Sequence, residues 1–218
     1  MGGDDGLLAA IRPGTTIIDC STSIPASTVK VAAQVEHKGG SFLDAAMTRT
    51  PNEAAQGRLN LLVGGDVQLL ERCRPILACF AENIVHAGAV GAGHRMKLLH
   101  NFVSLGSVAL IAEAAACARE SGIADEVLVD VLAKGGGWGA ALDRLKPYLV
   151  NNDTSGLRFS LANALKDIGY YNQMASDAGM PHQIAQSVLQ TVSIACEQGD
   201  PQALMPELVA RISAQKSR

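Results

Sequence analysis

Aromatic side chains are scarce in this sequence, and its cysteines show no pairing pattern. Aromatic residues make up 4% of the 218 residues while 48% are hydrophobic, which favours helices packed through aliphatic side chains. The five cysteines are scattered and odd in number, with no C-x-x-C pair. They indicate reduced thiols in a cytoplasmic protein and exclude a disulfide framework. Because no H-E-x-x-H motif or His/Cys cluster with ligand spacing occurs, we expect no metal.

A strong charge of one sign is also lacking. The 18 Lys and Arg residues against 21 Asp and Glu residues leave a net charge of -3, which gives no reason to expect nucleic acid or an anionic membrane as a partner. No apolar run free of polar residues is long enough to predict a membrane span, and no signal peptide opens the sequence. We therefore expect a globular protein with one large domain or two small ones.

Strand and helix patterns alternate over the first 90 residues. Short apolar or β-branched runs at 15–20, 41–46, 59–63 and 83–86 predict strands. Helices are predicted at 4–12, 26–37 and 67–77, and the polar segment 48–53 is expected to be a loop. This alternation is typical of an α/β domain with a mostly parallel sheet.

Only helical patterns follow Gly93. A long, alanine-rich and nearly uncharged helix is expected to run to about Gly122 and to be buried nearly all round. Further helices are predicted at 124–133, 142–149, 161–178, 182–198 and 206–212. The predicted fold class is therefore α/β followed by all-α, with one domain at 1–90 and a helical domain at 91–218.

A glycine-rich turn joins the two predicted domains and runs directly into the long helix. Its sequence is Gly88-Ala-Val-Gly-Ala-Gly-His-Arg-Met-Lys97-Leu-Leu-His-Asn101. Side chains four residues apart lie on one helix face, so Lys97 and Asn101 can converge on one small molecule. A buried ammonium is costly unless it is paired or used. The alternative is a lysine that extends to the surface. His94 lies in the turn, and we expect it to be a surface histidine.

The pattern G-x-G-x-x-x-K-x-x-x-N in this stretch resembles the catalytic signature of the β-hydroxyacid dehydrogenases. That family includes 3-hydroxyisobutyrate dehydrogenase and tartronate semialdehyde reductase, with 6-phosphogluconate dehydrogenase as a relative. The resemblance implies hydride transfer between NAD or NADP and a small hydroxy acid or its semialdehyde. Lys97 would be the general acid/base, its pKa lowered by partial burial, and Asn101 would hold the reacting oxygen or the carboxylate. His100 is given no role.

A second segment, Asp19-Cys-Ser-Thr-Ser-Ile-Pro25, resembles the family's D-x-S-T-x-x-P. It follows a predicted strand, at the end where open α/β sheets bind ligands. The resemblance implies that Ser21 lies near the substrate and Thr22 near the nicotinamide ribose. The alternative is a Ser/Thr cap of the next helix, supplied by Ser23 or Ser27, and capping is compatible with ligand binding.

A third segment, Asp44-Ala-Ala-Met-Thr-Arg-Thr50, stands where the family has D-A-P-V-S-G-G. The resemblance implies that Thr48, Arg49 and Thr50 bind the anionic end of the substrate. A guanidinium offers a bidentate fork for carboxylate, sulfonate or phosphate, and the Thr-Arg pair is closer to the sulfolactaldehyde reductase branch. The alternative is an exposed loop arginine.

A fourth segment, from Phe159 to Lys166-Asp167, resembles the family's F-x-x-x-x-x-x-K-D-[LI]. The resemblance implies that Phe159 and Lys166 face the cofactor or the acidic substrate, and that Asp167 supports its helix or neighbouring elements. A solvated helix face is the alternative. Trp138, in a glycine-rich turn, borders the substrate pocket or plugs an edge of the core.

One family element is missing from the sequence. In the family, a G-x-G-x-x-G turn after the first strand leads into a helix whose N-terminus holds the cofactor pyrophosphate. No such turn is present here, and no acidic residue follows a second strand to bind the adenosine ribose. We therefore expect the sequence to begin inside the NAD(P)-binding domain, as a fragment, a misplaced start or a natural truncation.

The missing element has consequences for partners. A partial sheet exposes an edge and apolar faces, so we expect a homo-oligomer. The resemblance implies a small anionic substrate, a hydroxy acid or its semialdehyde. One alternative is a non-catalytic truncated homologue that acts as a binding or dimerisation module. Another is that a separate partner chain supplies the nucleotide-binding half.

Overall fold

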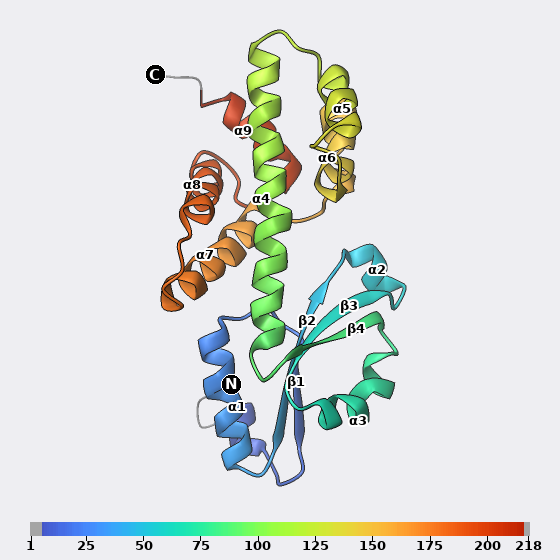
Figure 1. Cartoon of the computed structure of the whole chain (residues 1–218), viewed down its shortest axis with the longest axis vertical. Helices are drawn as coiled ribbons and strands as arrows, with labels where there is room; N and C mark the ends of the chain where they lie inside the picture. The colour runs from blue at the N-terminus through green and yellow to red at the C-terminus, as the bar shows by residue number, and fades with distance from the viewer. Residues whose placement is uncertain (1–5, 216–218) are drawn as a thin grey trace. The chain divides into compact units, whose positions relative to one another are not determined.

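The computed structural model describes residues 6–215 and divides the chain into two compact units. One unit extends to Leu99 and the other begins at His100, so the division falls inside the long helix α4 (Ala92–Glu120). The first unit combines a sheet with helices and the second is helical, which confirms the predicted fold class. Figure 1 shows the elements of each unit.

The sheet of the first unit has the strand order β1-β2-β3-β4. Its strands are β1 (Thr16–Asp19), β2 (Ser41–Thr48), β3 (Leu59–Gly64) and β4 (Ala81–Gly88). The outer pairs are parallel, but β2 and β3 are antiparallel. The link between β2 and β3 contains only the short helix α2 (Pro51–Ala55), whereas a parallel pair needs a crossover of about a dozen residues or more. The sheet is therefore mixed.

Two local differences from the predicted elements have simple causes. The loop expected at 48–53 is wrong in part, because Thr50 and Glu53 form a capping box at the start of α2. The Glu53 carboxylate accepts from the backbone N–H of Thr50 at 3.0 Å, and Pro51 fits the first helical position. The helix expected at 4–12 is a 3-10 turn at Leu7–Ala10, and residues 4–5 lie outside the described part.

Neighbouring residues of β2 pack against different helices. Phe42 packs with Val35 of α1 (Pro25–His37), whereas Leu43 packs with Leu70 of α3 (Val67–Leu77). Because successive side chains of a strand point to opposite faces, α1 and α3 cover opposite faces of the sheet (Figure 1). The buried residues between them form the core of this unit.

The second unit packs its helices around the inner face of α4. Its other helices are α5 (Asp125–Lys134), α6 (Ala140–Asn151), α7 (Leu161–Asp177), α8 (Gln183–Glu197) and α9 (Leu208–Ser213). On α4, Leu105, Val108, Ala112 and Ala115 recur every three or four residues and are buried in one core. That spacing places them along a single stripe of the helix.

The outer face of α4 corrects one expectation. The helix is not buried nearly all round, because Val103 and Leu110 are 65% and 74% exposed. By length and composition alone α4 is also apolar enough to cross a membrane, with a mean hydropathy of 1.5 over its best window. Polar residues are scattered along α4, so the helix contains no long uninterrupted apolar run. Half of that window is buried inside the structure, which is typical of a core helix.

Gly93 allows the first turn of α4 to lie directly on the sheet. A Cβ built at Gly93 would clash with the carbonyl oxygen of Leu62 and lie 2.7 Å from that of Asp44. Both neighbours are backbone atoms of strands and cannot move aside. The glycine at this position is therefore required by close packing between a helix and a sheet.

We expect Gly93→Ala to lower the free energy of unfolding by about 3 kcal/mol, because overpacking against backbone cannot relax. Urea unfolding of the variant and of Gly136→Ala would measure it. A Cβ at Gly136 meets nothing within 4 Å, so that variant is the matched control. Equal stabilities of the two variants would contradict the steric explanation.

Candidate active site

A buried carboxylate holds the start of α4. Asp44, in β2, is 0% exposed, and its two oxygens accept hydrogen bonds from the backbone N–H groups of Gly91 at 2.7 Å and His94 at 2.8 Å. First-turn N–H groups have no partner within their own helix and carry partial positive charge. Asp44 therefore satisfies two of these donors and links β2 to α4.

The same contact explains why the glycine-rich turn is not a phosphate site. Helix N-termini bind phosphate through their free first-turn N–H groups. Here the Asp44 carboxylate already occupies two of them, and a Cβ at Gly64 would lie 2.6 Å from the nearer Asp44 oxygen. Gly64 makes room for a protein carboxylate, which takes the place that a phosphate would occupy at this helix start.

His94 is fully buried, and the expectation of a surface histidine is wrong. Its Nδ1 lies 2.7 Å from the hydroxyl oxygen of Thr28 in α1. A signal was present in the sequence, because His94 stands at the head of the stripe 94, 98, 101 and 105, whose other members Leu98, Asn101 and Leu105 are also buried. Its place in the turn favoured the surface, whereas its place in this stripe indicates burial.

Lys97 and Asn101 occupy successive turns of α4, and both are buried. Lys97 is 9% exposed and Asn101 is 5% exposed. This burial separates Lys97 from a lysine that extends into solvent. A lysine retained in such surroundings carries a desolvation penalty, as expected for a group with a chemical or structural task.

In the helical unit, Asn101 is hydrogen-bonded to a residue far along the chain. Its Nδ2 donates to Oδ2 of Asp167 at 2.6 Å, and Asp167 is buried in α7. Lys166 forms an ion pair with the other carboxylate oxygen at 3.2 Å, without the geometry of a hydrogen bond. The Lys166 ammonium is half-exposed and lies 5.8 Å from the centre of the Tyr170 ring. Asn101 and Lys166, two predicted site residues, thus share the Asp167 carboxylate.

The segment after β1 contains Ser21 and Thr22, and neither hydroxyl caps the following helix α1. Ile24 is the N-cap of α1, and it forms no side-chain cap. The expected capping role of Ser23 or Ser27 is therefore wrong. The backbone N–H of Ser21 donates to Oδ1 of Asp19 at 2.9 Å, and Thr22 is partly exposed. Cys20 lies between Asp19 and Ser21 in the sequence. Burial, and to a smaller extent the charge of Asp19, raises the pKa of the Cys20 thiol, so the thiol is protonated at neutral pH.

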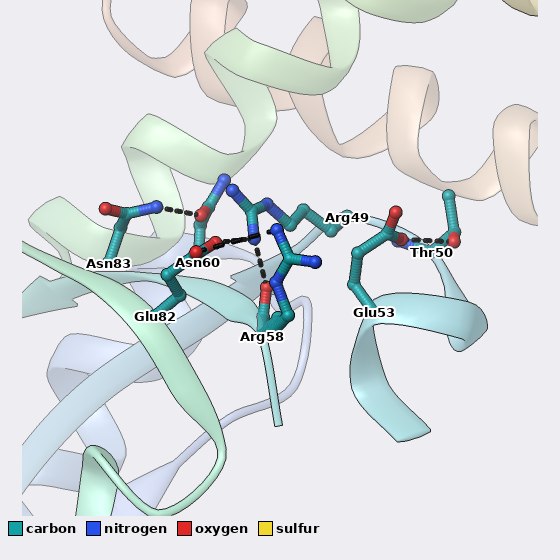
Figure 2. A network of polar contacts seen from close by, with 7 residues as sticks. All are labelled: Arg49, Thr50, Glu53, Arg58, Asn60, Glu82 and Asn83. Atoms are coloured by element: carbon teal, nitrogen blue, oxygen red, sulfur yellow. Dashed lines mark hydrogen bonds and ion pairs between the residues drawn. The ribbon is translucent and has the colours of Figure 1, made fainter. Parts of the chain in front are cut away.

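Arg49, at the end of β2, lies in a network of charged side chains (Figure 2). Its guanidinium forms an ion pair with Glu82 of β4 and donates to the backbone oxygen of Arg58 at 2.5 Å. Arg58 also pairs with Glu82, at 3.6 Å. The hydrogen bond from Arg49 lowers the pKa of the Glu82 carboxyl, with smaller contributions from nearby charge. Arg49 is thus an exposed loop arginine, as the alternative had it, and its guanidinium is held in this network.

The neighbours of Arg49 differ in exposure. Thr48 is buried at the end of β2. Thr50 is the N-cap of α2. A hydrogen bond from its hydroxyl lowers the pKa of the Glu53 carboxyl. The hydroxyl of Thr50 is therefore engaged by its own helix.

The remaining aromatic candidates lie in the helical unit. Phe159 is partly buried and packs against the core of that unit. Trp138 is 73% exposed, so the expectation that it plugs an edge of the core is wrong. Among the described residues, no group of three or more His, Cys, Asp and Glu side chains could hold a metal ion.

The helical unit also contains an apolar cavity between α4 and α8. Its volume is about 390 Å³, and its lining includes Val103, Gly106, Leu110, Ile184 and Val188. Glu113 is the acidic residue of this lining. None of the predicted site residues belongs to it.

We expect Asp44→Asn to lower the free energy of unfolding by about 3 kcal/mol, because an amide N–H₂ would face one of the two backbone donors and leave it unsatisfied. Asp66→Asn is the matched control. Asp66 caps α3 by accepting one N–H, that of Leu69 at 2.8 Å, and asparagine caps equally well. Urea unfolding would compare the two, and a similar loss in both variants would contradict the role given to Asp44.

Both units match family models of known proteins. Residues 1–88 match the family model for the NAD binding domain of 6-phosphogluconate dehydrogenase. Residues 91–212 match the model for the NAD-binding domain of NADP-dependent 3-hydroxyisobutyrate dehydrogenase. A structure of Mycobacterium tuberculosis 3-hydroxyisobutyrate dehydrogenase with L-serine is 30% identical, has a TM-score of 0.84, and is matched over 96% of this chain and 73% of that one.

Curated relatives agree with these matches. The NAD-dependent L-serine dehydrogenase of Pseudomonas aeruginosa is 34% identical over 84% of this chain and 60% of that protein. The 3-sulfolactaldehyde reductase of Escherichia coli is 31% identical over 82% of this chain and 60% of that protein. The chain thus spans about 60% of the length of these two relatives. On these matches, the chain belongs to the 3-hydroxyisobutyrate dehydrogenase family of β-hydroxyacid dehydrogenases.

Proposed function

We propose that the chain takes part in hydride transfer between NAD or NADP and a small β-hydroxy acid or its semialdehyde, with Lys97 as the general acid/base. The observation that carries this proposal is the burial of Lys97, at 9% exposure, within the signature that the family uses for this chemistry. The relatives are named as dehydrogenases and reductases. The proposed location is the cytoplasm.

Lys97 moves the proton while the nicotinamide, when bound, exchanges the hydride. In the oxidation of an alcohol, the carbon loses a hydride and the hydroxyl oxygen loses a proton. The neutral amine of Lys97 accepts that proton through Nζ. In the reverse direction, the Lys97 ammonium donates a proton to the carbonyl oxygen as the carbon gains a hydride. Both directions require a lysine that gains and loses a proton during turnover.

Asn101 holds the reacting oxygen or the carboxylate of the substrate in this proposal. Its Nδ2 donates one N–H to Asp167 at 2.6 Å, which fixes the rotation of the amide and leaves the second N–H as the donor for a substrate oxygen. His100 Nδ1 lies 3.1 Å from Oδ1 of Asn101. Asp167 therefore orients Asn101, a role that supports the assignment.

The anionic end of the substrate is assigned to Thr48, Arg49 and Thr50, with Ser21 near the reacting group. Arg49 offers a fork suited to carboxylate or sulfonate. Glu82 already partners that guanidinium, so an anion would share Arg49 with Glu82 or replace it. The names of the relatives, such as 3-sulfolactaldehyde reductase, are consistent with a small anionic substrate.

The described residues fit one part of a nicotinamide cofactor. The hydroxyl of Thr22 is not used as a helix cap and suits a ribose. Lys166 suits an acidic group, and Phe159 contributes an apolar surface. The first-turn donors of α4 are taken by Asp44, so the pyrophosphate would need donors outside this turn. We assign Thr22, Phe159 and Lys166 to the cofactor side.

We expect the purified chain to bind NADH or NADPH and to oxidise a substrate such as L-serine or 3-hydroxyisobutyrate, with kcat lowered about 100- to 10,000-fold in Lys97→Ala. Lys134→Ala is the matched control, because Lys134 is an exposed helix lysine paired with Asp130. Calorimetry would measure cofactor binding and absorbance at the nicotinamide band would measure turnover.

In the same assay, Arg49→Met should raise KM more than it lowers kcat, because it removes ground-state binding.

Each outcome of this experiment has a distinct meaning. Turnover that survives Lys97→Ala would contradict the role of Lys97. A folded chain that binds neither cofactor would contradict an enzyme formed by this chain alone. Activity restored by a co-purifying nucleotide-binding protein would support a partner chain that supplies the missing half.

The rival proposal is a non-catalytic module that associates through its helical unit. The apolar cavity between α4 and α8 favours it, because Val103, Leu110 and Ile184 are large apolar side chains exposed along one surface. Monomeric proteins rarely leave such surfaces uncovered. Self-association is compatible with either proposal and is expected in both.

We expect Leu110→Glu to raise the dissociation constant of a homodimer about tenfold or more, because it places a charge in the centre of this apolar surface. Analytical ultracentrifugation over a range of concentrations would measure it. Val67→Glu is the matched control, because Val67 is about half-exposed in the other unit. A monomeric wild-type chain, or equal weakening by both variants, would contradict association through this surface.

A further inference from the structure

The first turns of α1 and α4 are joined by one buried hydrogen bond between side chains. The hydroxyl oxygen of Thr28 lies 2.7 Å from Nδ1 of His94, and neither residue is appreciably exposed. Thr28 also lies 3.3 Å from the backbone oxygen of Ile24, the N-cap of α1. The pair thus connects the beginning of one helix with the beginning of another.

The surroundings of the pair assign the direction of its hydrogen bonds. The Nε2 atom of His94 is buried and has no hydrogen-bond partner in the described part of the chain. A buried N–H without an acceptor is more costly than a buried lone pair on nitrogen. The imidazole is therefore protonated on Nδ1, which donates to Thr28, while the Thr28 hydroxyl donates to Ile24. Both groups keep a single, directed arrangement.

The pair lies between two segments that the proposed function uses. Upstream of Thr28, the chain carries Ser21 and Thr22 in the link between β1 and α1. Downstream of His94, Lys97 lies three residues along α4, on the adjoining turn. The Thr28–His94 bond thus ties the β1–α1 segment to the turn that carries Lys97.

Asp44 contributes a second tie to the same turn. It accepts from the backbone N–H of His94 at 2.8 Å, so His94 is held through both its main chain and its side chain. Four residues along β2 from Asp44 lies Thr48, part of the proposed anion site. The first turn of α4 is therefore the point where the β1–α1 segment, β2 and the Lys97 turn are fastened together.

We infer that Thr28 and His94 are positioning residues for Lys97: their hydrogen bond sets the rotation of the first turn of α4 and with it the direction of the Lys97 amine. This inference rests on the proposed function, in which Lys97 carries the proton. A proton carrier must stay within hydrogen-bond reach of the reacting oxygen, and a misplacement of about 1 Å can cost about 100-fold in rate. The pair itself does not touch the substrate.

Thr28→Val tests the inference, because valine keeps the shape of threonine and removes the hydroxyl. The first readout is the rate at which Lys97 is reductively methylated in the full-length chain, followed by mass spectrometry of the Lys97 peptide. We expect that rate to change about threefold or more, since the amine loses its fixed direction. Thr28→Ser should restore the wild-type rate. This readout needs no cofactor and no turnover.

Val35→Ala is the matched control for lost stability. Val35 is fully buried on the same helix, in the cluster with Ile17 and Phe42, and makes no part of the pair. It should lower the unfolding midpoint at least as much as Thr28→Val and leave the Lys97 methylation rate within about 1.5-fold of wild type. In a chain that turns over, Thr28→Val should lower kcat about tenfold with KM nearly unchanged.

Two results would overturn the inference. One is a Lys97 methylation rate in Thr28→Val no different from that in Val35→Ala. The other is a Thr28→Ser variant that folds but fails to restore the rate. Should Thr28→Val fold poorly, Thr28→Ala is compared in its place. Turnover that persists in Lys97→Ala would defeat the proposed function separately, whatever the methylation rates show.

Discussion

Asp44 cannot be solvated where it lies, and the first unit is arranged so that two backbone N–H groups take the place of water. A buried carboxylate without such partners would be strongly unfavourable. The two donors come from Gly91 and His94, so the helix that carries Lys97 can begin only at this point of β2. The glycines at 64 and 93 follow from the same constraint, because any side chain there would meet the carboxylate or the strand backbone. One interaction thus sets the helix start, the glycine pattern and the height of Lys97 above the sheet.

The family signature consequently has two physical parts. Gly93 serves close packing against β2 and β3 and Gly91 adopts a positive φ of 86°, whereas the lysine and asparagine lie on the helix that follows. A glycine-rich turn before a helix usually indicates a phosphate site. The same kind of turn is also found where a protein carboxylate, here Asp44, accepts hydrogen bonds from the N–H groups at the helix N-terminus. Only the position of Asp44, far upstream in the chain, separates the two cases.

The sequence predicted the order and type of most elements because strands and helices here carry clear periodicities and end at glycine or proline. It missed α2, although T-P-N-E is a capping-box sequence, and it could not foresee that β2 and β3 are antiparallel. Strand direction depends on whether the intervening link can cross the sheet, which is a property of three dimensions. In the same way, the bonds from Thr28 to His94 and from Asn101 to Asp167 join residues 66 positions apart. Periodicity carries no information about such pairs, so the hydrogen bond from Thr28 to His94 was not foreseen and Asp167 received only a general supporting role.

Arg49 shows how a departure from the family pattern acquires a physical meaning. Its φ of 82° lies in the left-handed region, which glycine adopts freely and other residues rarely do. The family's glycine suits this backbone, whereas an arginine is strained there unless its side chain is held. Glu82 and the Arg58 carbonyl hold it. The same contacts neutralise the guanidinium charge. In the proposed function, an anion at Arg49 would therefore compete with Glu82 for this guanidinium.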